Sequence, residues 1–445
     1  MTPFIVDDDR QSAWLVTTIA PTIKASPAAE KTTKTTDSPS NKDSKVTTEV
    51  DCAEDISVAL EWKLLLPLLV PGTRDPQPDD DRRVVEARCP ADEQACLEQG
   101  HECVAQTIRE AGEEAVTLHS LLKEGVEEKD FWGSGWVVKK ANSAEPLDEE
   151  KAFNGYIWVP VEICSPKMRF ADADTRVRMR RVLDVLRSNY RLAANCSCEV
   201  HIHLGRMDGR AWSLATLQRL GSLLWVAEPR LRSIRDPNSP NFDNTYTWGF
   251  AMRQRSRLAR GLGLGGLVTA PSDFGDIPDR QIINAIRGST MVPFEEACAL
   301  AAIWKAASHL ELGQLLSGPE RKYRRLGCNF SAFGEEDERA RRNPRTMEFR
   351  MMEGSVDIEL VLGWLVICGT IAKTAVVRSD GRFTAALDLL LQTPDERLLS
   401  DSEARLSGET AGDRRGREFR ELMQALGIRE EHYGGFEHKI RCEHC

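Results

Sequence analysis

The sequence predicts an α+β fold in which a mainly antiparallel, curved sheet has helices packed on one side. Two observations lead to this class. Short segments in which apolar and polar residues alternate begin near residues 56, 156, 199 and 346. Longer segments with helical spacing of apolar residues lie between and after them. Alternation gives each strand one apolar face for the helices and one polar face.

Length, hydrophobic content and net charge limit the number of domains and the kinds of partner that we expect. The chain has 445 residues, of which 41% are hydrophobic, enough for one large domain or two ordinary ones. Its net charge of −10 argues against a nucleic acid or an anionic membrane as partner. Arginines at 176–191 and 339–345 leave a local basic patch possible. The oligomeric state is left open.

The N-terminus has no secretory signal, and the longest apolar run, residues 360–372, is too short to span a bilayer. We therefore expect an intracellular, cytoplasmic protein with reduced cysteines. Residues 1–50 are predicted to be a disordered leader, because the stretch 21–50 is rich in Thr, Lys, Ser, Pro and Ala. A folded domain is expected over 51–380, followed by a charged, helical extension over 381–445.

The first strand is expected from Ile56 to Leu64, with Pro67 and Pro71 ending the run. A short strand at 136–140 and a longer one at 156–166 follow, and Pro160 in the longer strand indicates an edge or a bulge. The helices are expected where apolar residues recur every three or four positions, over 98–122, 174–191, 293–309, 357–377 and 415–426, with a further helix capped by Ser213.

A His-x-His pair is the most distinctive feature of the third strand. His201 and His203 are two residues apart, so in a strand they point to the same face, while Val200 and Ile202 point to the other. Two imidazoles on one face suit a site for metal, phosphate or carboxylate. They equally suit two histidines that form hydrogen bonds in a polar groove, and spacing alone leaves both interpretations open.

Acidic residues occupy comparable positions on the other strands. Glu162 lies among apolar residues, either in a site or facing solvent from an edge strand. Glu348 and Arg350 share a face, as suits recognition of an anion or a cross-strand salt bridge. Together with Glu61 and the two histidines, they could hold Mg²⁺ and a nucleoside triphosphate on one face of the sheet.

The order of these motifs resembles the amidoligase family, relatives of the glutamine synthetase and glutamate–cysteine ligase superfamily known from fungal genomes. The matching stretches lie in the same order along most of the ordered chain, at 58–61, 136–143, 161–166, 198–205, Glu228 with its helix, and 347–364. The resemblance implies a glutamine synthetase-like catalytic core and an ATP-dependent carboxylate–amine ligase that works through an acyl phosphate.

The resemblance also implies roles for individual residues. The metal ligands would be Glu61, Glu162, His203 and Glu348. The catalytic residues would be Glu162, His201, His203 and Arg350, and Arg350 and Lys63 would bind the nucleotide. ATP and Mg²⁺ would be the cofactors, and the substrates would be small-molecule or peptide carboxylates and amines.

Two departures from the family pattern leave other functions open. Lys63 stands where the first strand of the family carries a second acid, and Ala141 stands where the family carries an Asp. A catalytically inactive homologue that binds a nucleotide or a partner is therefore the alternative. A zinc hydrolase built on His-x-His would need further ligands, and between His203 and the C-terminal extension over 381–445 the sequence offers only His309. The terminal pair Cys442 and Cys445 could bind metal or oxidise.

Overall fold

The computed structural model describes residues 51–236, 239, 251–261, 279–288, 294–320, 324–334, 345–379, 381–391 and 408–442. The predicted leader over 1–50 lies outside these residues. So do most of the second arginine cluster, 339–344, and the C-terminal residues 443–445.

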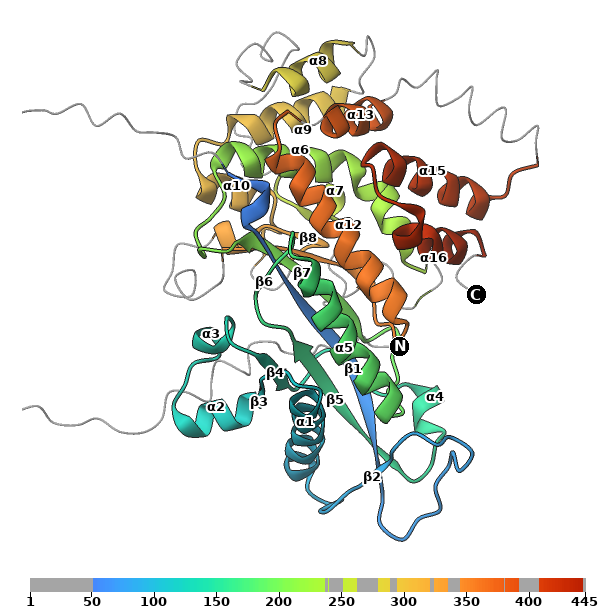
Figure 1. Ribbon diagram of the computed structural model, residues 1–445. Coiled ribbons are helices and arrows are strands. Elements are labelled where there is room, and N and C mark those ends of the chain that lie inside the picture. The colour runs from blue at the N-terminus through green and yellow to red at the C-terminus, as the bar shows by residue number, and fades with distance from the viewer. Residues whose placement is uncertain are drawn as a thin grey trace, which may run out of the picture. The chain divides into compact units, whose positions relative to one another are not determined.

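One open, mostly antiparallel sheet runs through the described residues (Figure 1). Its strands follow the order β3-β4-β5-β1-β7-β9-β8, and β2 and β6 pair with β1 at its ends. The pairs β1–β2 and β3–β4 are parallel, and the others are antiparallel. The predicted α+β class with a mainly antiparallel sheet is therefore confirmed. The strands are β1 Ile56–Leu69, β2 Val85–Glu86, β3 Ala115–Thr117, β4 Trp136–Lys139, β5 Tyr156–Cys164, β6 Met168–Arg169, β7 Glu199–Arg206, β8 Cys328–Asn329 and β9 Met347–Glu353.

Helices cover the apolar face of this sheet. Helix α12 packs on β1 and β7, α1 packs on β1, β4 and β5, and α5 contacts both α1 and α12 (Figure 1). Helices α6, α15 and α16 add a further layer, since α6 and α16 pack against α12 and α15 packs against both of them. The helices are α1 Glu93–Glu110, α2 Leu118–Glu124, α3 Glu128–Phe131, α4 Asp148–Lys151, α5 Ala173–Asn189, α6 Leu214–Leu231, α7 Met252–Arg255, α8 Arg280–Gly288, α9 Phe294–Lys305, α10 His309–Leu315, α12 Ile358–Val376, α13 Gly381–Leu390, α15 Ala411–Ala425 and α16 Glu430–Arg441.

Strand β1 shows how the two faces differ. Val58, Leu60 and Trp62 have no exposed surface and belong to the main hydrophobic core, whereas Glu61 and Lys63, on either side of Trp62, point to the polar face. Helix α12 is long and apolar enough to cross a membrane, but 78% of its most apolar window is buried inside the protein. Its contacts with β1, β7 and α6 are those of a core helix.

The predicted end of the first strand is wrong. Strand β1 continues through Pro67 to Leu69, and Pro67 pairs with Trp158 of β5. The main-chain groups of Leu65 and Leu69 bond on the side away from β5, to Ala193 and Ala87. Alternation places Pro67 on that same side, between these two contacts, so its missing N–H interrupts no strand pairing.

Two predicted helices are shorter than expected. Instead of continuing to residue 122, α1 ends at Glu110, where Gly112 adopts a positive φ of 87° and the chain turns into β3 and α2. The helix expected over 293–309 ends at Lys305, and Ser308 caps a separate helix, α10. The prediction also missed α16, which follows the turn at Gly427 and packs on α12.

Other local predictions are confirmed. Ser213 caps α6 by accepting a hydrogen bond from the main-chain N–H of Thr216. The helix expected over 357–377 is α12, and Asp357 caps it by accepting from the main-chain N–H groups of its second and third residues. Pro160 lies where β5 has a free edge, because the pairing with β4 covers Glu162 to Cys164 and stops short of it.

We predict that Trp62→Ala lowers the free energy of unfolding by about 3–5 kcal/mol. The fully buried indole is lost from the core, and its Nε1–H, which donates to the Ser355 carbonyl at 2.7 Å, is lost with it. Urea denaturation followed by circular dichroism measures the change. Trp62→Phe is the control, and its cost should be less than half as large; equal costs would contradict the assignment of Trp62 to the packed core.

Candidate functional site

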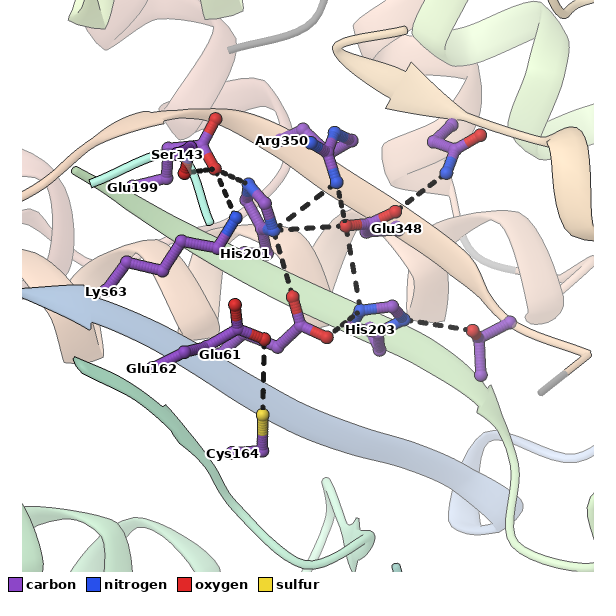
Figure 2. Close-up of polar contacts among 12 residues, drawn as sticks. Glu61, Lys63, Ser143, Glu162, Cys164, Glu199, His201, His203, Glu348 and Arg350 are labelled. Atoms are coloured by element: carbon purple, nitrogen blue, oxygen red, sulfur yellow. Dashed lines mark hydrogen bonds and ion pairs between the residues drawn. The ribbon is translucent and has the colours of Figure 1, made fainter. Parts of the chain in front are cut away.

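The polar face of the sheet carries a cluster of charged side chains arranged in three rows across the strands (Figure 2). In an antiparallel sheet, residues directly opposite each other on neighbouring strands point to the same face and contact one another. The register therefore determines which charges meet, and each row follows from the pairing of β4, β5, β1, β7, β9 and β8.

The first row alternates in sign from β4 to β7. Lys139 lies opposite Glu162, and Glu162 lies opposite Lys63. Lys139 Nζ is 3.3 Å from Glu162 Oε1 and 2.8 Å from Glu128 Oε1. Lys63 Nζ donates to Glu199 Oε2 at 2.5 Å, and Ser143 Oγ donates to the same oxygen at 3.4 Å (Figure 2).

The second row is centred on His201. Cys164 lies opposite Glu61, and Glu61 lies opposite His201. His201 Nδ1 is 3.0 Å from Glu61 Oε2 and 3.1 Å from Glu348 Oε1, and its Nε2 is 2.9 Å from Glu199 Oε2. One fully buried imidazole thus connects three carboxylates that come from three strands (Figure 2).

The third row runs from His203 to Asn329. His203 lies opposite Glu348, which in turn lies opposite Asn329. His203 Nε2 is 3.1 Å from Glu61 Oε1, and its Nδ1 is 3.1 Å from Thr346 Oγ1. Asn329 donates to Glu348 Oε2 at 2.7 Å, so Glu348 is held on both oxygens.

Arg350 joins the cluster at an irregularity in the sheet. The register between β7 and β9 shifts between Val200 and Ile202, so β9 has one extra residue opposite His201. Arg350 Nη1 donates to Glu348 Oε1 at 2.6 Å and lies 3.5 Å from His201 Nδ1. Bulges are common next to active sites because they redirect a side chain without ending the strand.

The charges in the cluster fix one another's protonation. Burial alone would raise the pKa of Glu199, but Lys63 and His201 outweigh it and lower that pKa to about 2. Burial, Arg350 and Lys63 lower the pKa of His201, but Glu199 and the other contacts of the ring raise it to about 9. Both groups are therefore charged at neutral pH.

Neighbouring cations also lower the pKa values of Glu61 and Glu348. Burial would raise the pKa of Glu61, but His203 and His201 hold it well below the ordinary value. Burial would also raise the pKa of Glu348, which Arg350 and the two histidines lower well below the ordinary value. Cys164 differs, because burial raises the pKa of its thiol well above the usual range, and it stays protonated.

Exposure changes steadily across the cluster. The side chains of Glu199 and His201 have no exposed surface, those of Glu348 and Arg350 are 7% and 8% exposed, and Glu61 is 23% exposed. His203 is 18% exposed. The cluster is therefore reached from solvent at Glu61, at His203 and at Lys139, whose side chain is 20% exposed, and it is closed at Glu199.

Two sets of side chains in this cluster have donor atoms close enough to hold a metal ion. Glu61, His203 and Glu348 form one set, and Glu61, Glu162 and Cys164 form the other. The donor atoms in each set lie within 4.8 Å of one another. The first set, with two carboxylates and an imidazole, suits Mn²⁺ or Mg²⁺ completed by water or substrate oxygens.

The structure brings together the side chains that the sequence singled out. The predicted site residues Glu61, Lys63, Glu162, His201, His203, Glu348 and Arg350 all lie in this cluster. Glu228, which belongs to a matching stretch, serves another purpose: it accepts the main-chain N–H groups of Met252 and Arg253 at the start of α7. Ala141 packs in a small apolar cluster with Leu65 and Cys198.

Among the described residues, His309 does not join the two histidines of β7 as the further ligand of the zinc-hydrolase alternative. His309 Nε2 bonds to the main-chain oxygen of Trp212 at 2.7 Å, and His309 belongs to neither set of metal-binding donors. Cys442 Sγ lies 3.7 Å from His438 Nε2, while the rest of the terminal Cys-x-x-Cys lies outside the described residues.

Sequence reasoning missed four members of the cluster. Glu199 shares its face with His201 and His203 by simple alternation, so the pattern contained the signal. Lys139 could have been found in the same way from the polar end of the strand at 136–140. Cys164 looked like a small core residue, and Asn329 had no signal in the sequence, because only the register of β8 on β9 places it beside Glu348.

Comparison with known proteins gives one finding. Residues 96–259 match the family model described as "Putative amidoligase enzyme". The matched segment contains β4, β5 and β7, and therefore Lys139, Glu162, Glu199 and the two histidines, whereas β1 and β9 lie outside it. No curated protein and no solved structure matches the chain.

We predict that breaking the Lys63–Glu199 pair from either side destabilises the fold by about 3–5 kcal/mol, because a fully buried partner is left charged or unpaired. Lys63→Met and Glu199→Gln should each show this loss in urea denaturation. The double variant should recover at least half of the summed loss. The exposed pair Lys140–Glu93 is the control, with a coupling below about 1 kcal/mol; similar coupling in both pairs would contradict the prediction.

We also predict that His201 makes stability depend on pH. Its pKa of about 9 in the folded protein exceeds the value of about 6.5 in an unfolded chain. The stabilisation is therefore complete below pH 6.5 and is lost as the pH rises through 9. Between these values the free energy of unfolding, measured with a chelator present, should fall by about 2–3 kcal/mol. His201→Gln should flatten this dependence, and an unchanged slope would refute the assignment.

Proposed function

We propose that the protein is an ATP-dependent carboxylate–amine ligase, and that its reaction takes place at the exposed end of the charged cluster. The observation that carries the proposal is the convergence of Glu61, His203, Glu348 and Arg350 on one sheet face. The family match over 96–259 supports a ligase type of function. ATP, Mg²⁺, the acyl phosphate and a glutamine synthetase-like core are parts of the proposal.

The proposed reaction has two steps. A substrate carboxylate oxygen attacks the γ-phosphorus of ATP, the bond to the β–γ bridging oxygen breaks, and an acyl phosphate and ADP result. An amine nitrogen then attacks the acyl carbon, loses a proton, and expels inorganic phosphate as the amide forms. Both steps gather negative charge on phosphate oxygens, so fixed positive charges and a divalent ion lower their barriers.

The residues of the first set fit a divalent ion. Glu61 and Glu348 contribute carboxylate oxygens and His203 contributes an imidazole nitrogen, and all three reach the more exposed end of the cluster. Mg²⁺ bound there would neutralise charge on the β- and γ-phosphates. Glu162 lies on the other side of Glu61, in the second set.

The remaining residues have roles that follow from their contacts. Arg350 is a planar, permanently charged donor that already holds Glu348, and we assign it to the transferring phosphoryl group or the substrate carboxylate. Lys63 supplies a second fixed cation from β1. His201, with no exposed surface, is a positioning residue: it holds Glu61 and Glu348 at 3.0 and 3.1 Å from the same ring nitrogen.

The substrates are proposed to be small-molecule or peptide carboxylates and amines, in keeping with an intracellular enzyme that uses cytoplasmic ATP. The alternative, an inactive homologue that binds a nucleotide or a partner, differs from the enzyme in a single measurable respect. It would show no turnover, and where its ligand is a nucleotide it would bind that nucleotide at the same cluster.

We predict that the purified chain releases ADP from MgATP when supplied with a matching carboxylate and amine, measured with panels of both. Glu348→Gln should lower this rate by about 100-fold or more, because it removes a carboxylate from the centre of the site. The same variant should weaken Mn²⁺ binding measured by calorimetry. Glu359→Gln on the exposed surface of α12 is the matched control and should change neither quantity.

Three outcomes are distinguishable in this experiment. Turnover that Glu348→Gln abolishes supports the ligase. Nucleotide binding without turnover across the panels favours the inactive homologue. Failure to bind either Mn²⁺ or nucleotide, in folded protein, rejects the proposed site altogether.

A further inference from the structure

The two sets of possible metal ligands differ in the charges around them. They share Glu61, so one ion that takes Glu61 leaves the second set with Glu162 and the thiol of Cys164. That thiol donates a hydrogen bond to Glu162 Oε1 at 3.5 Å, so it is already engaged with the carboxylate beside it. What remains on this side is one carboxylate.

Two lysines lie directly beside that carboxylate. Lys139 Nζ is 3.3 Å from Glu162 Oε1, and Lys63 lies opposite Glu162 in the register of β1 and β5. Each lysine is anchored by a second acid, Lys139 by Glu128 at 2.8 Å and Lys63 by Glu199 at 2.5 Å. The two ammonium groups are therefore held in place on this side of Glu61.

We infer that Lys63 and Lys139 take the place of a second divalent ion, so that the site binds one metal ion and not two. The inference rests on the proposed function, because it assumes that the set of Glu61, His203 and Glu348 holds an ion. A second dication near Glu162 would face two ammonium groups and one carboxylate that already pairs with Lys139. Coulomb repulsion between an ammonium group and an ion bound to the same carboxylate is strong in partly buried surroundings.

The arrangement also gives these lysines a role toward substrate. Phosphoryl transfer needs positive charge on more than one side of the transferring group. An ion held by Glu61, His203 and Glu348 would supply it there, and the lysines would supply it on the side of β4 and β5. Because ammonium groups are part of the chain, this charge is present at any metal concentration.

The test counts bound Mn²⁺ by the loss of the free-ion signal in electron paramagnetic resonance. Mn²⁺ is chosen because thiols elsewhere in the chain bind this hard ion weakly. We expect one Mn²⁺ per wild-type chain. Lys139→Glu replaces the cation with a carboxylate beside Glu162 and Glu128, and we expect it to bind two. Lys140→Glu, at the exposed neighbouring position, is the matched control and should still bind one.

Lys139→Met tests the charge alone in case the acidic variant does not fold. It should raise the affinity for a second Mn²⁺ by at least about tenfold over the wild-type chain, because one repelling charge is gone. Two ions on the wild-type chain, or no gain in either Lys139 variant, would overturn the inference and leave the proposed ligase standing. No Mn²⁺ on the wild-type chain would instead reject the metal site of the proposed function.

Discussion

The ion pair between Lys63 and Glu199 is the interaction on which the rest of the charged cluster depends. Glu199 is fully buried, and an isolated carboxylate in that position would be very costly or would take up a proton. With Lys63 beside it, Glu199 stays ionised and in turn keeps His201 charged. His201 then holds Glu61 and Glu348, so the geometry of these two acids is set by a buried pair.

A sheet suits this arrangement better than a set of loops would. Strand pairing fixes each side chain against its cross-strand neighbour, and hydrogen bonds along both strands resist displacement. Opposite charges therefore alternate along a row from Lys139 through Glu162 and Lys63 to Glu199. The apolar face of the same strands is covered by α1 and α12, so the positions of the charges are tied to the packing of the core.

Much of the fold and part of the site could be predicted from local pattern. Alternation located β1, β5, β7 and β9 and put His201 beside His203 and Glu348 beside Arg350. Strand order and register could not be predicted from the sequence, because they depend on contacts between segments as far apart along the chain as Glu61 and Glu348. The extent of β1 was missed for the same reason: Pro67 is tolerated because of where Ala193 and β2 happen to pair.

The role of Lys63 cannot be understood from its own strand alone. Considered within its own strand, a lysine in place of an acid indicates a lost metal ligand. The fold places the acid Glu199 of the neighbouring strand next to it, so the cluster keeps a carboxylate at this point and gains a cation. That an acid on one strand compensates for a lysine on the next can be recognised only when the pairing of the two strands is known.

The balance of charge bears on how the proposed substrates would bind. The cluster pairs its acids with bases throughout, so opposite charges nearly balance without any ion. The acids are Glu61, Glu128, Glu162, Glu199 and Glu348, and the bases are Lys63, Lys139, His201, His203 and Arg350. A lone dication must compete with these cations for the carboxylates, so it binds less tightly than it would together with a compensating anion. A dication that arrives with a triphosphate brings its own compensating charge, and the phosphates can use the fixed cations that the carboxylates release. Metal and nucleotide are therefore expected to bind together, each raising the affinity of the cluster for the other.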